Sequence, residues 1–124
     1  MFEVTSEMNF SAAHHLRDYD GPCENVHGHN WLVRATVRCE ELNSIGIGVD
    51  FKILKSTLAE VLDKVDHTDL NTVFTEEIGN PSSENIAKFI YDKMDKIISD
   101  KRILMYRVDV YETPGNCASY IKSE

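Results

Sequence analysis

Two stretches of the chain alternate apolar and polar residues with a period of two, which indicates β-strands with one buried face. In the first stretch, at the N-terminus, the apolar residues are Phe2, Val4, Met8 and Phe10. The second runs from about residue 26 to residue 40, and its core-facing odd positions are Trp31, Val33, Ala35, Val37 and Cys39. Residues 11–26 contain Asp18, Asp20, Gly21 and Pro22, so a loop is expected between the two strands.

Two later stretches have helical spacing instead. The first follows Asp50, a suitable N-cap, and its apolar positions are Phe51, Leu54, Leu58, Val61, Leu62 and Val65. The second opens at Asn80-Pro81-Ser82-Ser83-Glu84, and its apolar positions are Ile86, Phe89, Ile90, Met94, Ile97 and Ile98. Residues 66–81, between the two helices, are expected to be mostly irregular.

Two more strands are predicted at residues 102–112 and about 117–122, with Pro114-Gly115-Asn116 as the turn between them. The apolar side of the first is assigned to Leu104, Tyr106, Val108 and Val110. The order β-β-α-α-β-β predicts an α+β fold, in which a four-stranded antiparallel sheet carries both helices on one face. Residues 1–124 are expected to form a single domain. The two open sheet edges favour assembly into a homo-oligomer.

The formal net charge is −8, with 21 acidic against 13 basic residues, and there is no basic cluster. This balance argues against a nucleic-acid partner. No apolar run reaches the roughly 20 residues needed to span a membrane, and the N-terminus lacks the features of a secretory signal. We therefore expect a cytoplasmic protein. The three cysteines are expected to be free thiols, with Cys39 and Cys117 as small buried hydrophobes.

Three histidines form the strongest chemical signal. His27 and His29 are two positions apart at the start of a strand, so their imidazoles point to the same face. His14 ends the preceding strand and joins them if the two strands pair. Three histidine ligands with a fourth position open to substrate are typical of catalytic zinc, which acts as a Lewis acid. The residues thus predict a Zn²⁺ site at His14, His27 and His29.

Other interpretations of these residues remain open. The histidines could be ordinary core or surface residues, or Cys23 could close the zinc shell and make the site structural. A zinc hydratase or hydrolase is a further alternative. His67 follows Asp66 at the end of the first helix, where spacing alone favours a simple helix-end interaction. The functional alternative is a relay in which Asp66 orients His67 and His67 activates a thiol.

Six motifs occur in order over nearly the whole chain. They are Phe10-Ser11-Ala12-Ala13-His14, Cys23-Glu24-Asn25-Val26-His27-Gly28-His29, Val49-Asp50-Phe51, Asp66-His67 followed by Leu70-Asn71, Asn80-Pro81-Ser82-Ser83-Glu84-Asn85, and Tyr111-Glu112-Thr113. In these motifs the chain resembles the 6-pyruvoyl-tetrahydropterin synthase / 6-carboxytetrahydropterin synthase family. The resemblance implies the tunnelling fold, in which three subunits close their sheets into a barrel and two trimers stack. It also implies sites at subunit boundaries.

The resemblance also implies roles for individual residues. His14, His27 and His29 match the zinc ligands, Cys23 matches the catalytic thiol, and Asp66 with His67 matches its relay partners. Glu112 matches the acid that anchors the pterin ring. A carboxylate near the end of an apolar strand face needs such a partner, and the two donors of the guanidine-like pterin edge suit it. Ser82, Ser83 and Glu84 match a Pro-Thr-x-Glu segment near the ring, with Ser82 keeping the hydroxyl of the usual threonine.

The implied substrate is 7,8-dihydroneopterin triphosphate. In the queuosine branch the product is 6-carboxy-5,6,7,8-tetrahydropterin, formed with acetaldehyde and triphosphate. In the biopterin branch only triphosphate leaves. Glu24 beside Cys23 resembles a folate-branch subgroup that forms 6-hydroxymethyl-dihydropterin, so Glu24 is a possible modifier of product choice. The short chain and the presence of Cys23 favour the queuosine branch. The sequence assigns no role to His15 and identifies no residues for the triphosphate.

Overall fold

The structure is a computed structural model that describes residues 1–18, 25–75 and 78–123. Strands β1 (Phe2–His14) and β2 (His27–Cys39) pair antiparallel along their whole length, from Phe2 opposite Cys39 to His14 opposite His27. The predicted alternation is confirmed in β2, where every second side chain from Trp31 to Cys39 is buried. These two strands are the longest of the sheet.

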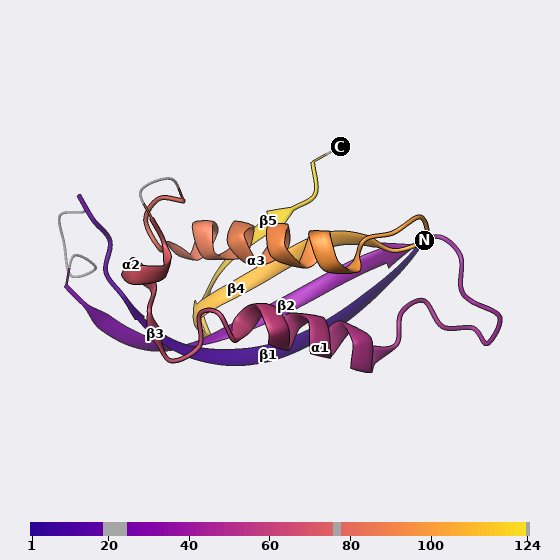
Figure 1. The fold of residues 1–124 in the computed structure, drawn as a ribbon, viewed down its shortest axis with the longest axis horizontal. Coiled ribbons are helices and arrows are strands. Elements are labelled where there is room, and N and C mark those ends of the chain that lie inside the picture. Colours follow the sequence, from indigo (N-terminus) through magenta and orange to yellow (C-terminus); the bar gives the residue numbers. More distant parts are fainter. Residues whose placement is uncertain (19–24, 76–77, 124) are drawn as a thin grey trace.

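The remaining elements are α1 (Phe51–Leu62), β3 (Thr68–Asp69), α2 (Leu70–Val73), α3 (Ser83–Ile98), β4 (Leu104–Thr113) and β5 (Asn116–Ile121). The sheet order is β3-β1-β2-β4-β5. Helices α1 and α3 lie on one face of the sheet (Figure 1). The α+β class is confirmed, but the four-stranded antiparallel sheet is corrected to a mixed five-stranded one, because β3 pairs parallel with the end of β1.

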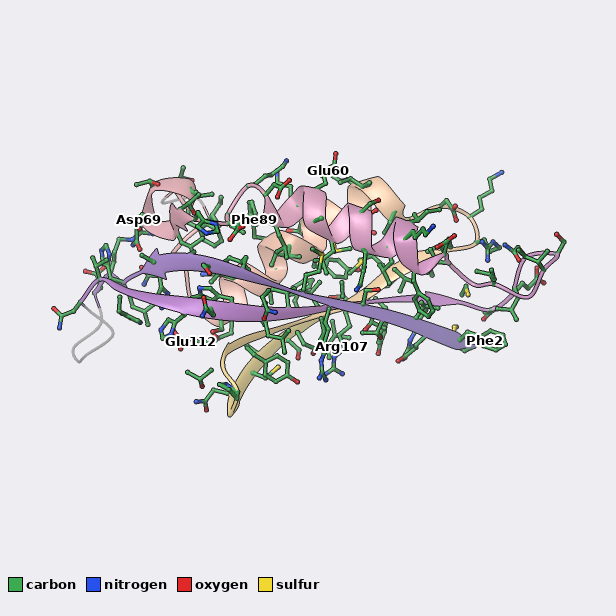
Figure 2. The ribbon with its side chains drawn as sticks, turned by 90° about the horizontal axis from the view of Figure 1, so that it is seen from below. Phe2, Glu60, Asp69, Phe89, Arg107 and Glu112 are labelled. Carbon is green, nitrogen blue, oxygen red and sulfur yellow. The ribbon has the colours of Figure 1, made fainter. Side chains whose placement is uncertain are left out.

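The hydrophobic core lies between the two long helices and the sheet. Helix α1 contributes Leu54, Leu58, Val61 and Leu62, and helix α3 contributes Ile86, Ile90, Met94 and Ile98. Phe51 and Ile97, which helical spacing placed on the buried side, are exposed at the flanks of that side. Figure 2 shows the two faces of this arrangement, with Glu60 on the outer side of α1 and Arg107 on the helix-free side of the sheet.

Strand β4 departs from the predicted alternation. Thr36 pairs with Arg107 but Val37 pairs with Met105, so a β-bulge adds one residue to β4 at this point. The bulge turns Met105 into the core, with 1% of its surface exposed, whereas Leu104 is 43% exposed. The assignment of Leu104 and Tyr106 to the core face was therefore wrong. Cys117, expected to be buried, is exposed on the edge strand β5.

None of the helices among the described residues has the length and apolar character needed to cross a membrane.

Candidate metal centre

The pairing of β1 with β2 brings the three histidines together. His14 lies opposite His27, and Ala12 lies opposite His29, so all three imidazoles are on the helix-covered face of the sheet. The Nε2 atoms of His14 and His27 are 3.0 Å apart. The ring of His29 is 5.4 Å from that of His14 and 4.6 Å from that of His27, measured between centroids. The three nitrogens converge at the end of the sheet opposite the N-terminus.

Glu112 joins this group from the neighbouring strand. Leu32 of β2 pairs with Tyr111 of β4, and the next position along places Glu112 beside Trp31 on the same face as the histidines. Its Oε1 atom lies 2.8 Å from Nε2 of His14 and 3.2 Å from Nε2 of His29. The four donor atoms all lie within 4.8 Å of one another. The sequence interpretation assigned Glu112 to the pterin ring, and the structure places its carboxylate directly beside the three histidine nitrogens.

Two main-chain carbonyls determine which nitrogen of each ring carries the proton. Nδ1 of His14 donates to the Pro81 carbonyl at 2.8 Å, and Nδ1 of His27 donates to the Asn25 carbonyl at 2.7 Å. A neutral imidazole has a single N–H, so in the neutral form of each ring Nε2 presents a lone pair to the cluster. A cation bound between these two nitrogens, which are 3.0 Å apart, would remove the repulsion of their lone pairs.

His29 supports the same conclusion. Its Nε2 atom is buried and has no hydrogen-bond partner among the described residues. Burial lowers the pKa of His29, and the nearby His27 and His14 lower it further, although Glu112 acts in the opposite direction. A neutral imidazole is the form that binds a metal. Three imidazole nitrogens and one carboxylate oxygen are a donor set typical of Zn²⁺, so the residues fit the expected ion.

Asp66 and His67, the predicted relay pair, are in contact beside β1. Oδ1 of Asp66 accepts a hydrogen bond from the Ser11 backbone N–H at 2.9 Å and lies 3.0 Å from Nδ1 of His67. The Ser11 N–H is the main cause that lowers the pKa of Asp66, and His67 contributes less. Helix α1 ends at Leu62, and His67 follows in a turn with its side chain 81% exposed. The relay role itself stays a prediction.

The start of α3 reaches the metal centre through its main chain. Ser82 is the N-cap of α3, and its hydroxyl oxygen accepts a hydrogen bond from the Asn85 N–H at 3.2 Å. Ser83 is half-buried and Glu84 is exposed in the first turn. Their predicted contacts with the pterin ring remain predictions. Cys23 and Glu24 lie outside the described residues.

Sequence reasoning missed several groups around the histidines. The carbonyls of Pro81 and Asn25 carry no side-chain signal, so no pattern identifies them in advance. Trp31 packs edge-on against His14 and His29, with ring centroids 4.8 and 5.4 Å apart, and its Nε1 donates to the Ala12 carbonyl. Its position two residues after His29 on the same strand was the available signal.

Comparisons with known proteins agree with this geometry. The family model described as "PTPS: 6-pyruvoyl tetrahydropterin synthase" matches residues 3–123. The chain belongs to this family. The description of the family and the group of three histidines and Glu112 agree. Together they identify the chain as a pterin synthase of the lyase type with a metal site. The tunnelling fold expected from the six motifs is therefore the fold of this family member.

Relatives of this chain carry one of two names. A 6-carboxy-5,6,7,8-tetrahydropterin synthase of Bacillus subtilis is 35% identical, over 96% of this chain and 84% of its own. One of Haemophilus influenzae with the same name is 28% identical, over 97% and 99%. The solved structure of a Caenorhabditis elegans 6-pyruvoyl tetrahydropterin synthase is 31% identical with a TM-score of 0.80, and the match covers 99% and 98% of the two chains.

Proposed function

We propose that this family member is a zinc-dependent lyase that converts 7,8-dihydroneopterin triphosphate to 6-carboxy-5,6,7,8-tetrahydropterin, acetaldehyde and triphosphate. The observation that carries the proposal is the convergence of His14, His27, His29 and Glu112 at one partly open point of the fold. The names of the B. subtilis and H. influenzae relatives favour this product. The corresponding pathway would be queuosine biosynthesis in the cytoplasm.

Each residue type suits one part of this chemistry. Zinc held by the three histidines would supply Lewis acidity toward the substrate's side-chain hydroxyls. Glu112 would accept the two N–H donors of the pterin edge. Its carboxylate lies 2.8 Å from His14, so a ring held by Glu112 would present its side chain close to the metal ligands. Ser82, Ser83 and Glu84 would contact the same ring from the start of α3.

Proton movement would fall to a second group. The Cys23 thiolate would take a proton from the substrate side chain, and His67 would support the thiolate as its base partner. Nδ1 of His67 faces the Asp66 carboxylate at 3.0 Å, the arrangement in which an acid orients an imidazole. The other side of the His67 ring is open to solvent, because 81% of the side chain is exposed.

The exposure of the His67 side chain supports assembly into a trimer or a dimer of trimers, with each site completed at a subunit boundary. Strand β3 pairs with β1 only at Ala12 and Ala13, and within the described ranges no strand pairs with the outer edge of β5. Open edges of this kind favour strand pairing between subunits.

Two other products have specific support. The solved C. elegans relative is a 6-pyruvoyl tetrahydropterin synthase by name, which favours loss of triphosphate alone. Glu24 next to Cys23 favours the folate-branch product, 6-hydroxymethyl-dihydropterin. Incubation of the zinc-loaded protein with 7,8-dihydroneopterin triphosphate, followed by mass analysis, separates the three. Acetaldehyde with the 6-carboxy product supports our proposal, and either other product or an unchanged substrate contradicts it.

A Cys23→Ala variant tests the alternative of a structural zinc site with Cys23 as fourth ligand. The proposal expects this variant to keep its zinc and to lose turnover by about 10²- to 10⁴-fold, as expected for loss of a general base. Cys117→Ala is the matched control, because it removes an exposed thiol on β5 and should leave turnover unchanged. If zinc and stability are lost together in Cys23→Ala, the site is structural.

A further inference from the structure

The segment that precedes α3 is tied to the end of β1 by an asparagine side chain. Oδ1 of Asn80 accepts a hydrogen bond from the Arg17 N–H at 2.9 Å, and Nδ2 of Asn80 donates to the Arg17 carbonyl at 2.8 Å. Just beyond the last paired residue of β1, the Asn80 side chain thus makes the two main-chain hydrogen bonds that a neighbouring strand would otherwise make. The main-chain carbonyl of Asn80 is held separately, by Nδ2 of Asn85 at 2.8 Å.

Pro81 lies between these two asparagines, and its carbonyl is the partner of Nδ1 of His14. Proline has no N–H, so hydrogen bonds can hold the Asn80–Pro81 peptide only through the Asn80 carbonyl, which accepts from Asn85. The His14 side chain is 2% exposed, and its other ring nitrogen faces His27 and Glu112. The position of one carbonyl therefore sets both the tautomer and the direction of this ligand.

We propose that Asn80 and Asn85 are positioning residues for the metal centre. They hold the Pro81 carbonyl against Nδ1 of His14 and so direct Nε2 toward the metal. The inference rests on the metal site of the proposed function, but it does not depend on which reaction the site performs. Partners of this kind orient metal ligands and raise their basicity, and their loss weakens metal binding by about 10- to 100-fold.

Asn71 provides an internal comparison. Its Oδ1 accepts from the His15 N–H at 2.9 Å and its Nδ2 donates to the His15 carbonyl at 3.1 Å. It therefore makes the same pair of main-chain hydrogen bonds as Asn80, two residues earlier, without holding the Pro81 peptide. A variant at Asn71 loses the tethering of the strand end but keeps the orientation of the carbonyl.

The test compares Asn80→Ala, Asn85→Asp and Asn71→Ala with the parent protein. Asn85→Asp keeps the shape of the side chain but removes the donor to the Asn80 carbonyl. The zinc dissociation constant is measured by competition with a chelator of known affinity, without substrate, and thermal unfolding of the metal-free protein is measured in parallel. We expect Asn80→Ala and Asn85→Asp to bind zinc about 10- to 100-fold more weakly. Asn71→Ala should change the zinc dissociation constant by less than about threefold, a bound well below that loss.

Nitrogen NMR of ¹⁵N-histidine provides a signature that a general loss of stability would not produce. His14 should be protonated at Nδ1 in the parent protein and should lose that single form in Asn85→Asp. Unchanged zinc affinity in Asn85→Asp, or an equal loss in Asn71→Ala, would overturn the inference. A parent protein that binds no zinc would overturn it as well. Zinc binding with the expected variant effects but without pterin turnover would leave it standing and would refute the proposed reaction alone.

Discussion

The two faces of the sheet differ in how their polar side chains are paired. On the helix-free face, acids lie beside arginines of the next strand, with Glu3 2.8 Å from Arg38 and Glu7 2.7 Å from Arg34. On the helix-covered face, polar groups gather at one end, where three histidines and Glu112 meet. Among the described residues, no lysine or arginine forms a salt bridge with this cluster.

This difference separates structural polar groups from functional ones. On the helix-free face Glu3 and Glu7 are each paired with an arginine, and Arg38 also lies over the ring of Tyr106 at 3.4 Å. Exposed pairs of this kind contribute little to stability. In the cluster, three ring nitrogens and a carboxylate oxygen point at one another, an arrangement that a bound cation would stabilise. Polar groups without a partner of opposite charge thus indicate the functional site, whereas the paired charges of the other face have a structural role only.

The sharpest test of this comparison removes one donor from the cluster. His29→Ala should weaken zinc binding by more than about 100-fold, since even loss of a partner of a ligand weakens it 10- to 100-fold. Nε2 of His29 makes no hydrogen bond among the described residues, and its one salt-bridge contact there is with Glu112, at 3.2 Å, so the metal-free variant should still fold. Competition with a chelator measures the affinity. His67→Ala is the control, because His67 lies outside the donor group, and equal losses in both variants would contradict the assignment.

On the helix-free face the largest effect is expected at Asp109, which is 9% exposed. It accepts hydrogen bonds from Arg107 at 2.7 Å and from the Ser119 hydroxyl. Asp109→Ala leaves both donors without this acceptor and should lower the free energy of unfolding by about 1–3 kcal/mol. Urea denaturation measures this change. Zinc affinity should stay the same, and a weaker affinity would show that the two faces are coupled.

Asp66 should produce a pH-dependent effect. The Ser11 N–H lowers its pKa in the folded protein, so Asp66 stabilises the fold above the ordinary aspartate pKa of about 3.9. This contribution is lost as the pH falls through the folded pKa. The difference in unfolding free energy between the parent protein and Asp66→Asn should therefore be present at pH 6 and vanish in strong acid. Denaturation at a series of pH values measures it; a difference independent of pH would contradict the assignment.

The smallest effect is expected at Glu7, whose side chain is 53% exposed beside Arg34. Glu7→Gln should lower the free energy of unfolding by at most about 1 kcal/mol, and less in high salt, because salt screens exposed charges. Denaturation with and without added salt measures both values. A loss as large as that of Asp109→Ala would mean that the helix-free face is covered, and not open to water.

Local patterns predicted the elements more reliably than their edges. The alternation in β2 and the helical spacing of α1 and α3 appear in the structure because each depends on one buried face. Strand β3, with two residues, is too short to produce a period. The bulge in β4 left no pattern either, since the added residue is recognised only against its partners in β2.

The site divides in the same way. The sequence by itself determined that His27 and His29 share a face and that His14 joins them once β1 and β2 pair. Only the tertiary structure decided that the Glu112 carboxylate lies against Nε2 of His14 and that the Pro81 carbonyl directs His14. The physical reason is one of range. Side-chain period is a property of a few neighbouring residues, whereas these two contacts depend on how β4 and α3, far away in the chain, pack against β1 and β2.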